Sequence, residues 1–202
     1  MKVNIINSKI LDVIEKAEYC ILCSIRKEIE NRALENFLRN EVITNPEVRE
    51  KVKEALGFCE MHMKLLYERI FKGGTEDGLV FCIYLQDIYS EILERLKMGR
   101  ILQKGSCLIC KYIEEMEILY EETFLKLLEE EEFRKKYKDS KGLCVKHFLK
   151  LKNEFTKEKE IEILEEINLS LLDYIKKRGW EFRHDKPPKE APKKALIYLV
   201  GY

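Results

Sequence analysis

The sequence has few of the residues that end or bend helices. Its 202 residues include nine glycines and four prolines. Because these two residues are the strongest local breakers of regular structure, their scarcity leaves room for long helices. The sequence also lacks an uninterrupted run of 18 apolar residues, so no transmembrane helix is expected. Apolar residues recur at helical spacing instead, and we predict an all-α protein.

Net charge is absent as well. Lysine and arginine number 37, as do aspartate and glutamate. No overall field therefore attracts the chain to nucleic acid or to an anionic membrane. We expect no membrane partner. Nucleic-acid binding through a local basic face is only a third hypothesis, after a binding or adaptor role and a redox role.

Several catalytic and targeting patterns are also missing. The sequence has no phosphate-binding loop, GxGxxG, GxSxG or HExxH motif, and we predict no catalytic residue. The first twenty residues lack the apolar core of a signal peptide. These observations favour a cytoplasmic, non-enzymatic protein. In the reducing cytosol cysteines stay as thiols, so paired cysteines there indicate a metal or redox site.

The sequence does contain a Cys/His motif that occurs twice. Each copy consists of a CxxC pair and a CxxH pair, with 35 residues between the pairs in the first copy and 33 in the second, and a glycine lies two positions before each CxxH pair. The eight predicted metal ligands are Cys20, Cys23, Cys59 and His62 in the first copy, and Cys107, Cys110, Cys144 and His147 in the second. Thiolate and imidazole groups at this spacing can bind one tetrahedral metal ion.

Three thiolates and one imidazole suit a closed structural zinc site, so we predict two zinc ions. An iron–sulfur cluster with the same ligands is the alternative cofactor. A thiol redox protein that uses the CxxC pairs is a further alternative, although no strand pattern precedes either pair. A helix of about 17 residues, a loop and a helix of about 11 could return the chain to its start. We therefore expect each repeat to close its own site, although exchange of ligands between repeats stays open.

The duplication suggests a helical repeat at residues 1–100, a second at 101–178 and a C-terminal arm at 179–202. Together these form an all-α fold of two pseudo-repeated halves. The arm is predicted to carry a short helix over one end of the bundle. Cys82 lies alone in an apolar run and is expected in the core. His184 has no partner motif and is interpreted as a tail residue rather than a ligand.

The pattern resembles an uncharacterised bacterial family of helical proteins with duplicated CxxC…GFCxxH motifs. The resemblance rests on Cys20/Cys23, on Gly57-Phe58-Cys59 with His62, on Cys107/Cys110, on Gly142-Leu143-Cys144 with His147, and on the tail Trp180-Glu181-Phe182-Arg183-His184. It supports the fold and implies no activity, substrate or partner.

Overall fold

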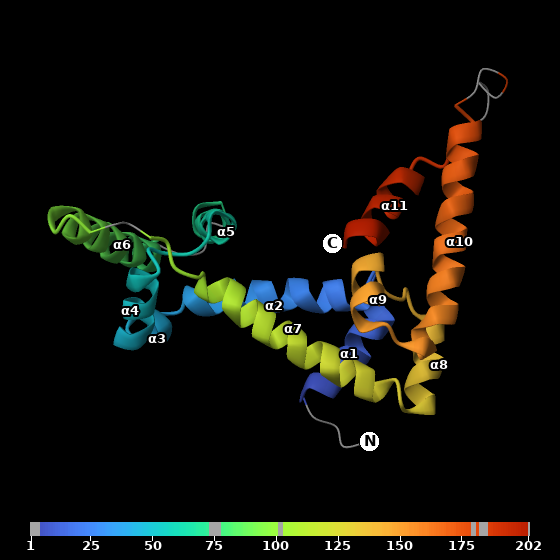
Figure 1. Cartoon of the computed structure of the whole chain (residues 1–202), viewed down its shortest axis with the longest axis horizontal. Coiled ribbons are helices and arrows are strands. Elements are labelled where there is room, and N and C mark those ends of the chain that lie inside the picture. Colours follow the sequence, from blue (N-terminus) through green and yellow to red (C-terminus); the bar gives the residue numbers. More distant parts are fainter. Residues whose placement is uncertain (1–4, 73–77, 101–102, 179–180, 182–185, 202) are drawn as a thin grey trace. The chain divides into compact units, whose positions relative to one another are not determined.

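A computed structural model describes residues 5–72, 78–100, 103–178, 181 and 186–201. Within these ranges every long regular element is an α-helix (Figure 1), which confirms the predicted all-α class. The helices are α1 (Ile5–Lys16), α2 (Ile21–Phe37), α3 (Asn40–Ile43), α4 (Pro46–Glu54), α5 (Glu60–Phe71), α6 (Leu79–Lys97), α7 (Leu108–Leu127), α8 (Glu131–Asp139), α9 (Val145–Leu151), α10 (Glu154–Lys176) and α11 (Ala191–Val200). None of the described helices is long and apolar enough to cross a bilayer.

The chain forms two compact units. One contains residues 1–27 and 118–202, and the other contains residues 28–117. These units do not follow the two sequence repeats, because their boundaries fall inside α2 and α7. The helices α2 and α7 therefore each begin in one unit and end in the other.

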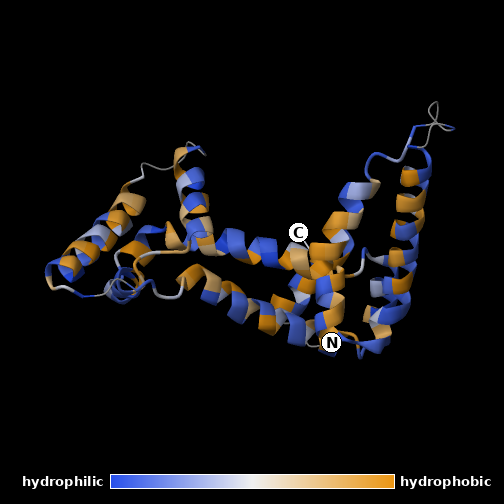
Figure 2. Ribbon diagram, turned by 45° about the horizontal axis from the view of Figure 1, so that its top comes forward, coloured by the Kyte–Doolittle hydropathy of each residue, from blue (hydrophilic) through white to orange (hydrophobic). Residues whose placement is uncertain are grey.

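Local sequence signals explain where the helices begin. Asn45 caps α4 by accepting a hydrogen bond from the backbone N–H of Glu47 (2.9 Å), and Pro46 occupies the first turn. In α1, the buried residues Ile10, Val13 and Ile14 follow the predicted helical spacing. Figure 2 shows the same mixture of hydrophobic and hydrophilic residues along the other helices.

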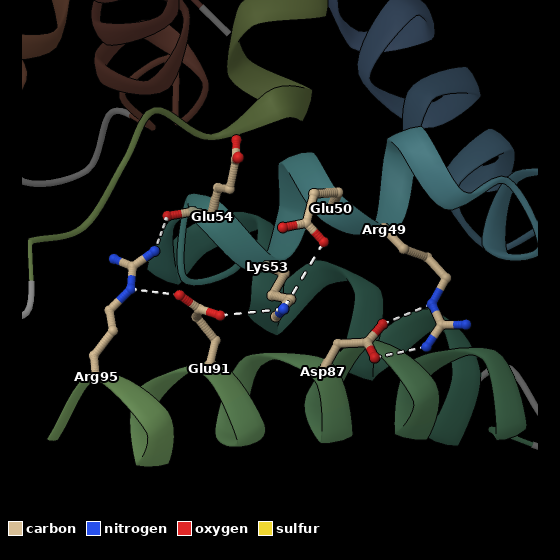
Figure 3. Close-up of polar contacts among 7 residues, drawn as sticks. All are labelled: Arg49, Glu50, Lys53, Glu54, Asp87, Glu91 and Arg95. Atoms are coloured by element: carbon tan, nitrogen blue, oxygen red, sulfur yellow. Dashed lines mark hydrogen bonds and ion pairs between the residues drawn. The ribbon is translucent and has the colours of Figure 1, made fainter. Parts of the chain in front are cut away.

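In the unit of residues 28–117, α4 packs against α6 and a row of ion pairs lies across their contact (Figure 3). The Arg49 guanidinium donates two hydrogen bonds to the Asp87 carboxylate, at 2.7 and 2.6 Å. Glu91 accepts from Arg95 (2.6 Å) and pairs with Lys53 (3.3 Å). The bidentate Arg49–Asp87 pair fixes the register of the two helices more strongly than single surface pairs do.

The predicted core position of Cys82 is wrong, because Cys82 is exposed. The buried residues of α6 are Phe81, Tyr84 and Ile88, whose spacing defines the inward face of the helix. Cys82 follows Phe81 by one residue and is therefore rotated about 100° away from that face. An apolar run alone does not show which of its members point inward.

In the other unit, α11 packs against α9 and α10 (Figure 1). Tyr198 of α11 is buried with Ile163 and Ile167 of α10, and its hydroxyl donates to the Lys141 carbonyl oxygen (2.8 Å). The tail therefore carries a short helix, as predicted, and this helix packs against α9 and α10. Four tail residues of interest, Trp180, Phe182, Arg183 and His184, lie outside the described residues.

Candidate metal centres

The first donor set, called centre A here, joins the N-termini of α2 and α9. It consists of Cys20, Cys23, Cys144 and His147, all buried. The Nδ1 atom of His147 lies 3.3, 3.4 and 3.2 Å from the sulfurs of Cys20, Cys23 and Cys144. The sulfurs of Cys23 and Cys144 are 3.7 Å apart.

The second donor set, centre B, joins the N-termini of α5 and α7. It consists of Cys59, His62, Cys107 and Cys110. The Nδ1 atom of His62 lies 3.1, 3.4 and 3.4 Å from the sulfurs of Cys59, Cys107 and Cys110. The sulfurs of Cys59 and Cys110 are 3.7 Å apart. Unlike centre A, this set includes an exposed cysteine, Cys110, and a partly exposed one, Cys59.

The expectation that each repeat closes its own site is therefore wrong, although all eight predicted ligands converge in two groups of four. Each group takes its CxxC pair from one repeat and its CxxH pair from the other. The reason is the path of the chain after α2. The 17 residues of α2 extend for about 25 Å, and α4 then packs against α6 instead of running back along α2. Cys59 therefore does not return to Cys20.

The distances within each set fit a single tetrahedral ion. Zinc bonds of about 2.3 Å to sulfur and 2.0–2.1 Å to nitrogen place neighbouring donors about 3.5–3.8 Å apart at tetrahedral angles. The two sulfur–sulfur separations of 3.7 Å match this value, and the sulfur–nitrogen separations of 3.1–3.4 Å lie slightly below it. All four donor atoms of each set lie within 4.8 Å of one another.

Helix N-termini favour anionic ligands at both centres. Cys59 and Cys144 are the N-cap residues of α5 and α9. Cys20 and Cys107 immediately precede the first residues of α2 and α7. The positive end of each helix dipole therefore stabilises the thiolate form that a metal requires. Each centre receives this contribution from two helices.

The buried thiols also interact with one another. Burial raises the pKa of Cys20, whereas hydrogen bonds from Cys20 and Cys23 lower the pKa of Cys144. Burial opposes protonation of His147, but its contacts with Cys144 and Cys23 outweigh this and raise its pKa to about 9. Because a metal binds thiolates and neutral imidazole, binding must displace protons from such a set, and its affinity rises with pH.

Residues around the donors hold the ligands in place. At centre B, Glu30 accepts a hydrogen bond from the Nε2 atom of His62 (3.2 Å), which leaves Nδ1 unprotonated for a metal. At centre A, Gly201 lies so close to the donors that a Cβ atom there would be 3.1 Å from the Cys23 sulfur. The end of α11 thus covers centre A.

A buried carboxyl group supports the turn that leads to Cys144. The Oε1 atom of Glu160 accepts hydrogen bonds from the Tyr137 hydroxyl and from the Leu143 backbone N–H (2.8 Å). Gly142 precedes Leu143 with a φ of +65°, and a Cβ atom there would lie 2.7 Å from Glu160. The turn before the CxxH pair therefore needs glycine at this position. Gly57 has a similar φ of +93° in the first repeat.

Glu160 should make stability depend on pH. Burial raises its pKa to about 7, above the unfolded value of about 4.3. The folded state therefore binds more protons between these values, and this carboxyl destabilises the fold as pH rises through that window. We expect the difference in unfolding free energy between Glu160→Gln and the wild type to change by about 2 kcal/mol from pH 5.5 to pH 8, in favour of the variant. Denaturant unfolding with saturating zinc measures the difference.

Comparing the two proteins at each pH removes the contribution of the metal ligands, because both chains contain the same eight. A difference in unfolding free energy that stays constant from pH 5.5 to 8 would contradict the assignment of this titration to Glu160.

Comparison with known proteins agrees with the duplication. The fold and the two donor sets define an internally repeated helical protein with paired Cys/His centres. The chain belongs to a family of unknown function (DUF6062), whose model matches residues 1–103 and again residues 94–177. No curated protein and no solved structure matches.

Sequence reasoning found all eight donor residues but missed Glu30, Glu160 and Gly201. Glu30 and Glu160 are two of many glutamates, and nothing in their local sequence distinguishes them. Gly201 lies 54 residues beyond His147, so its proximity to centre A has no sequence signal.

Proposed function

We propose that the protein is a zinc-stabilised helical binding protein, in which one zinc ion at each centre joins the two repeats. The observation that carries the proposal is the spacing of the donors, which matches one tetrahedral ion per centre. A multi-iron cluster distributes its thiolates over different iron atoms, so its ligands need a wider cage. The compact donor sets therefore favour zinc over a cluster.

A structural role for the metal follows from the ligand count. Four protein donors fill a tetrahedral zinc site and leave no position for water or substrate. Each ion would connect two helix N-termini that are distant in sequence, so its binding energy would contribute directly to folding. Reduced thiols of this kind are consistent with the cytoplasm.

A binding role is supported by apolar side chains that the described structure leaves exposed on its long helices. They include Tyr89, Leu93 and Leu96 on α6 and Leu169, Leu172 and Ile175 on α10. Tyr89, Leu93 and Leu96 recur on one face of α6, and contiguous exposed apolar groups are typical of surfaces that contact other proteins. The balanced charge makes nucleic acid a less suitable partner.

Elemental analysis tests the metal proposal. We expect two zinc ions per chain in colourless protein, purified with or without oxygen. Replacing Cys144 with alanine should reduce the content to one. Brown protein that contains iron and absorbs near about 400 nm would support the cluster instead.

A further inference from the structure

One face of α10 carries a stripe of exposed apolar residues that are spaced symmetrically about a central residue. Asn168 lies at its centre and is exposed. Leu164 and Leu172 lie four residues to either side, and Ile161 and Ile175 lie seven residues to either side. Their exposed fractions are 46% for Ile161, 40% for Leu164, 55% for Leu172 and 65% for Ile175.

The stripe is distinct from the face that α10 uses within its own unit. At 100° per residue, the four apolar side chains fall within about 40° of the direction of Asn168. The buried residues of α10, Thr156, Glu160, Ile163 and Ile167, lie on a face roughly 110° away. Figure 2 shows that hydrophobic residues recur along this helix. The second face therefore has no role in the core of the unit.

A symmetric stripe suits a symmetric partner. A two-fold axis through Asn168 would place Ile161 of one copy against Ile175 of the other, and Leu164 against Leu172. The two Asn168 side chains would meet on the axis, where a polar pair among apolar contacts fixes the register of paired helices. Each contact would then be repeated by symmetry, as in an isologous dimer interface.

Charge favours the antiparallel orientation that this axis requires. Glu158 lies ten residues before Asn168 and Lys176 eight residues after it, both about 80° to the same side of the stripe. In an antiparallel pair Glu158 of each copy faces Lys176 of the other, whereas a parallel pair brings like charges to the same level. Within its own copy, Glu158 forms an ion pair with Lys138. Both side chains of this pair are exposed, so the pair is weak and Glu158 can instead pair with Lys176 of the second copy.

We propose that the exposed stripe of α10 binds the same stripe of a second copy of this chain, forming an antiparallel two-helix dimer. The proposal names the partner for the binding role given above and rests on that role, but not on the metal. The stripe is about 21 Å long and offers on the order of 400 Å² of apolar surface per copy, which is small for a stable interface. We therefore expect a dissociation constant on the order of 10 µM.

Analytical ultracentrifugation of the zinc-loaded chain tests this proposal. Leu172→Glu should weaken dimerisation about 100-fold, because it places a charge at a buried contact. Leu119→Glu is the matched control, since Leu119 on α7 is 40% exposed and lies outside the stripe. Glu158→Lys and Lys176→Glu should each weaken the dimer, and the double variant should restore it.

A chain that carries two zinc ions and stays monomeric at about 200 µM would overturn the dimer and leave the zinc proposal standing. A dimer that Leu119→Glu disrupts and Leu172→Glu does not would also overturn it. Single charge reversals without effect would exclude the antiparallel orientation.

Discussion

Replacing Cys23 and Cys144 together with alanine should leave one zinc ion per chain, whereas replacing Cys23 and Cys59 together should leave none. Cys23 and Cys144 belong to the same centre although they lie in different repeats, so their joint loss damages one centre only. Cys23 and Cys59 lie in the same repeat but in different centres. The measurement is the number of zinc ions per chain that each variant retains in the presence of a competing chelator, determined by elemental analysis.

This pair of variants separates exchanged ligands from ligands that stay within a repeat. Both variants lose two cysteines. Effects that arise from cysteine loss in general are therefore shared, and each variant is the control for the other. The reverse outcome, with one zinc ion in Cys23→Ala/Cys59→Ala and none in Cys23→Ala/Cys144→Ala, would show that each repeat closes its own site.

Removal of metal by a chelator should lower the melting temperature by roughly 10 °C per centre. Metal at a thousand times its dissociation constant contributes about 4 kcal/mol of stability, and in a chain of this size each kcal/mol changes the melting temperature by roughly 2–4 °C. Zinc should leave centre B first, because Cys110 is exposed and Cys59 partly so, whereas all four donors of centre A are buried.

Stopped-flow chelation with a coloured zinc indicator measures the two release steps. Cys110→Ala should abolish the fast step and Cys144→Ala the slow one, which assigns each step to its centre. Release of both ions at one rate, or a fast step that persists in Cys110→Ala, would contradict the difference in access between the centres.

The two centres explain why the compact units differ from the sequence repeats. Each centre lies within one unit, and each combines two candidate donors from one repeat with two from the other. Loss of one ion should therefore affect parts of both repeats but mainly one unit. Each unit of structure is thus built from segments that are far apart in the chain.

The sequence alone identified the eight candidate donor residues, which the structure brings into two groups of four, and it predicted the helices. The pairing of Cys20 with Cys23, or of Cys59 with His62, depends only on spacing, because residues three apart at a helix N-terminus can point to one ion. Helix beginnings such as Asn45-Pro46 are equally local, since the capping groups lie within one turn. The glycines before the CxxH pairs signal a turn that the backbone angles of Gly57 and Gly142 confirm.

Only the tertiary structure decided which pairs meet. Pairing depends on where the chain goes between motifs, and α4 packs against α6 instead of running back along α2. The same limit applies to Cys82, whose exposure depends on which face of α6 is covered, and to Glu30 and Gly201, which reach the donors through space. Spacing fixes groups that share a helix turn, whereas contacts between distant segments depend on helix lengths and packing.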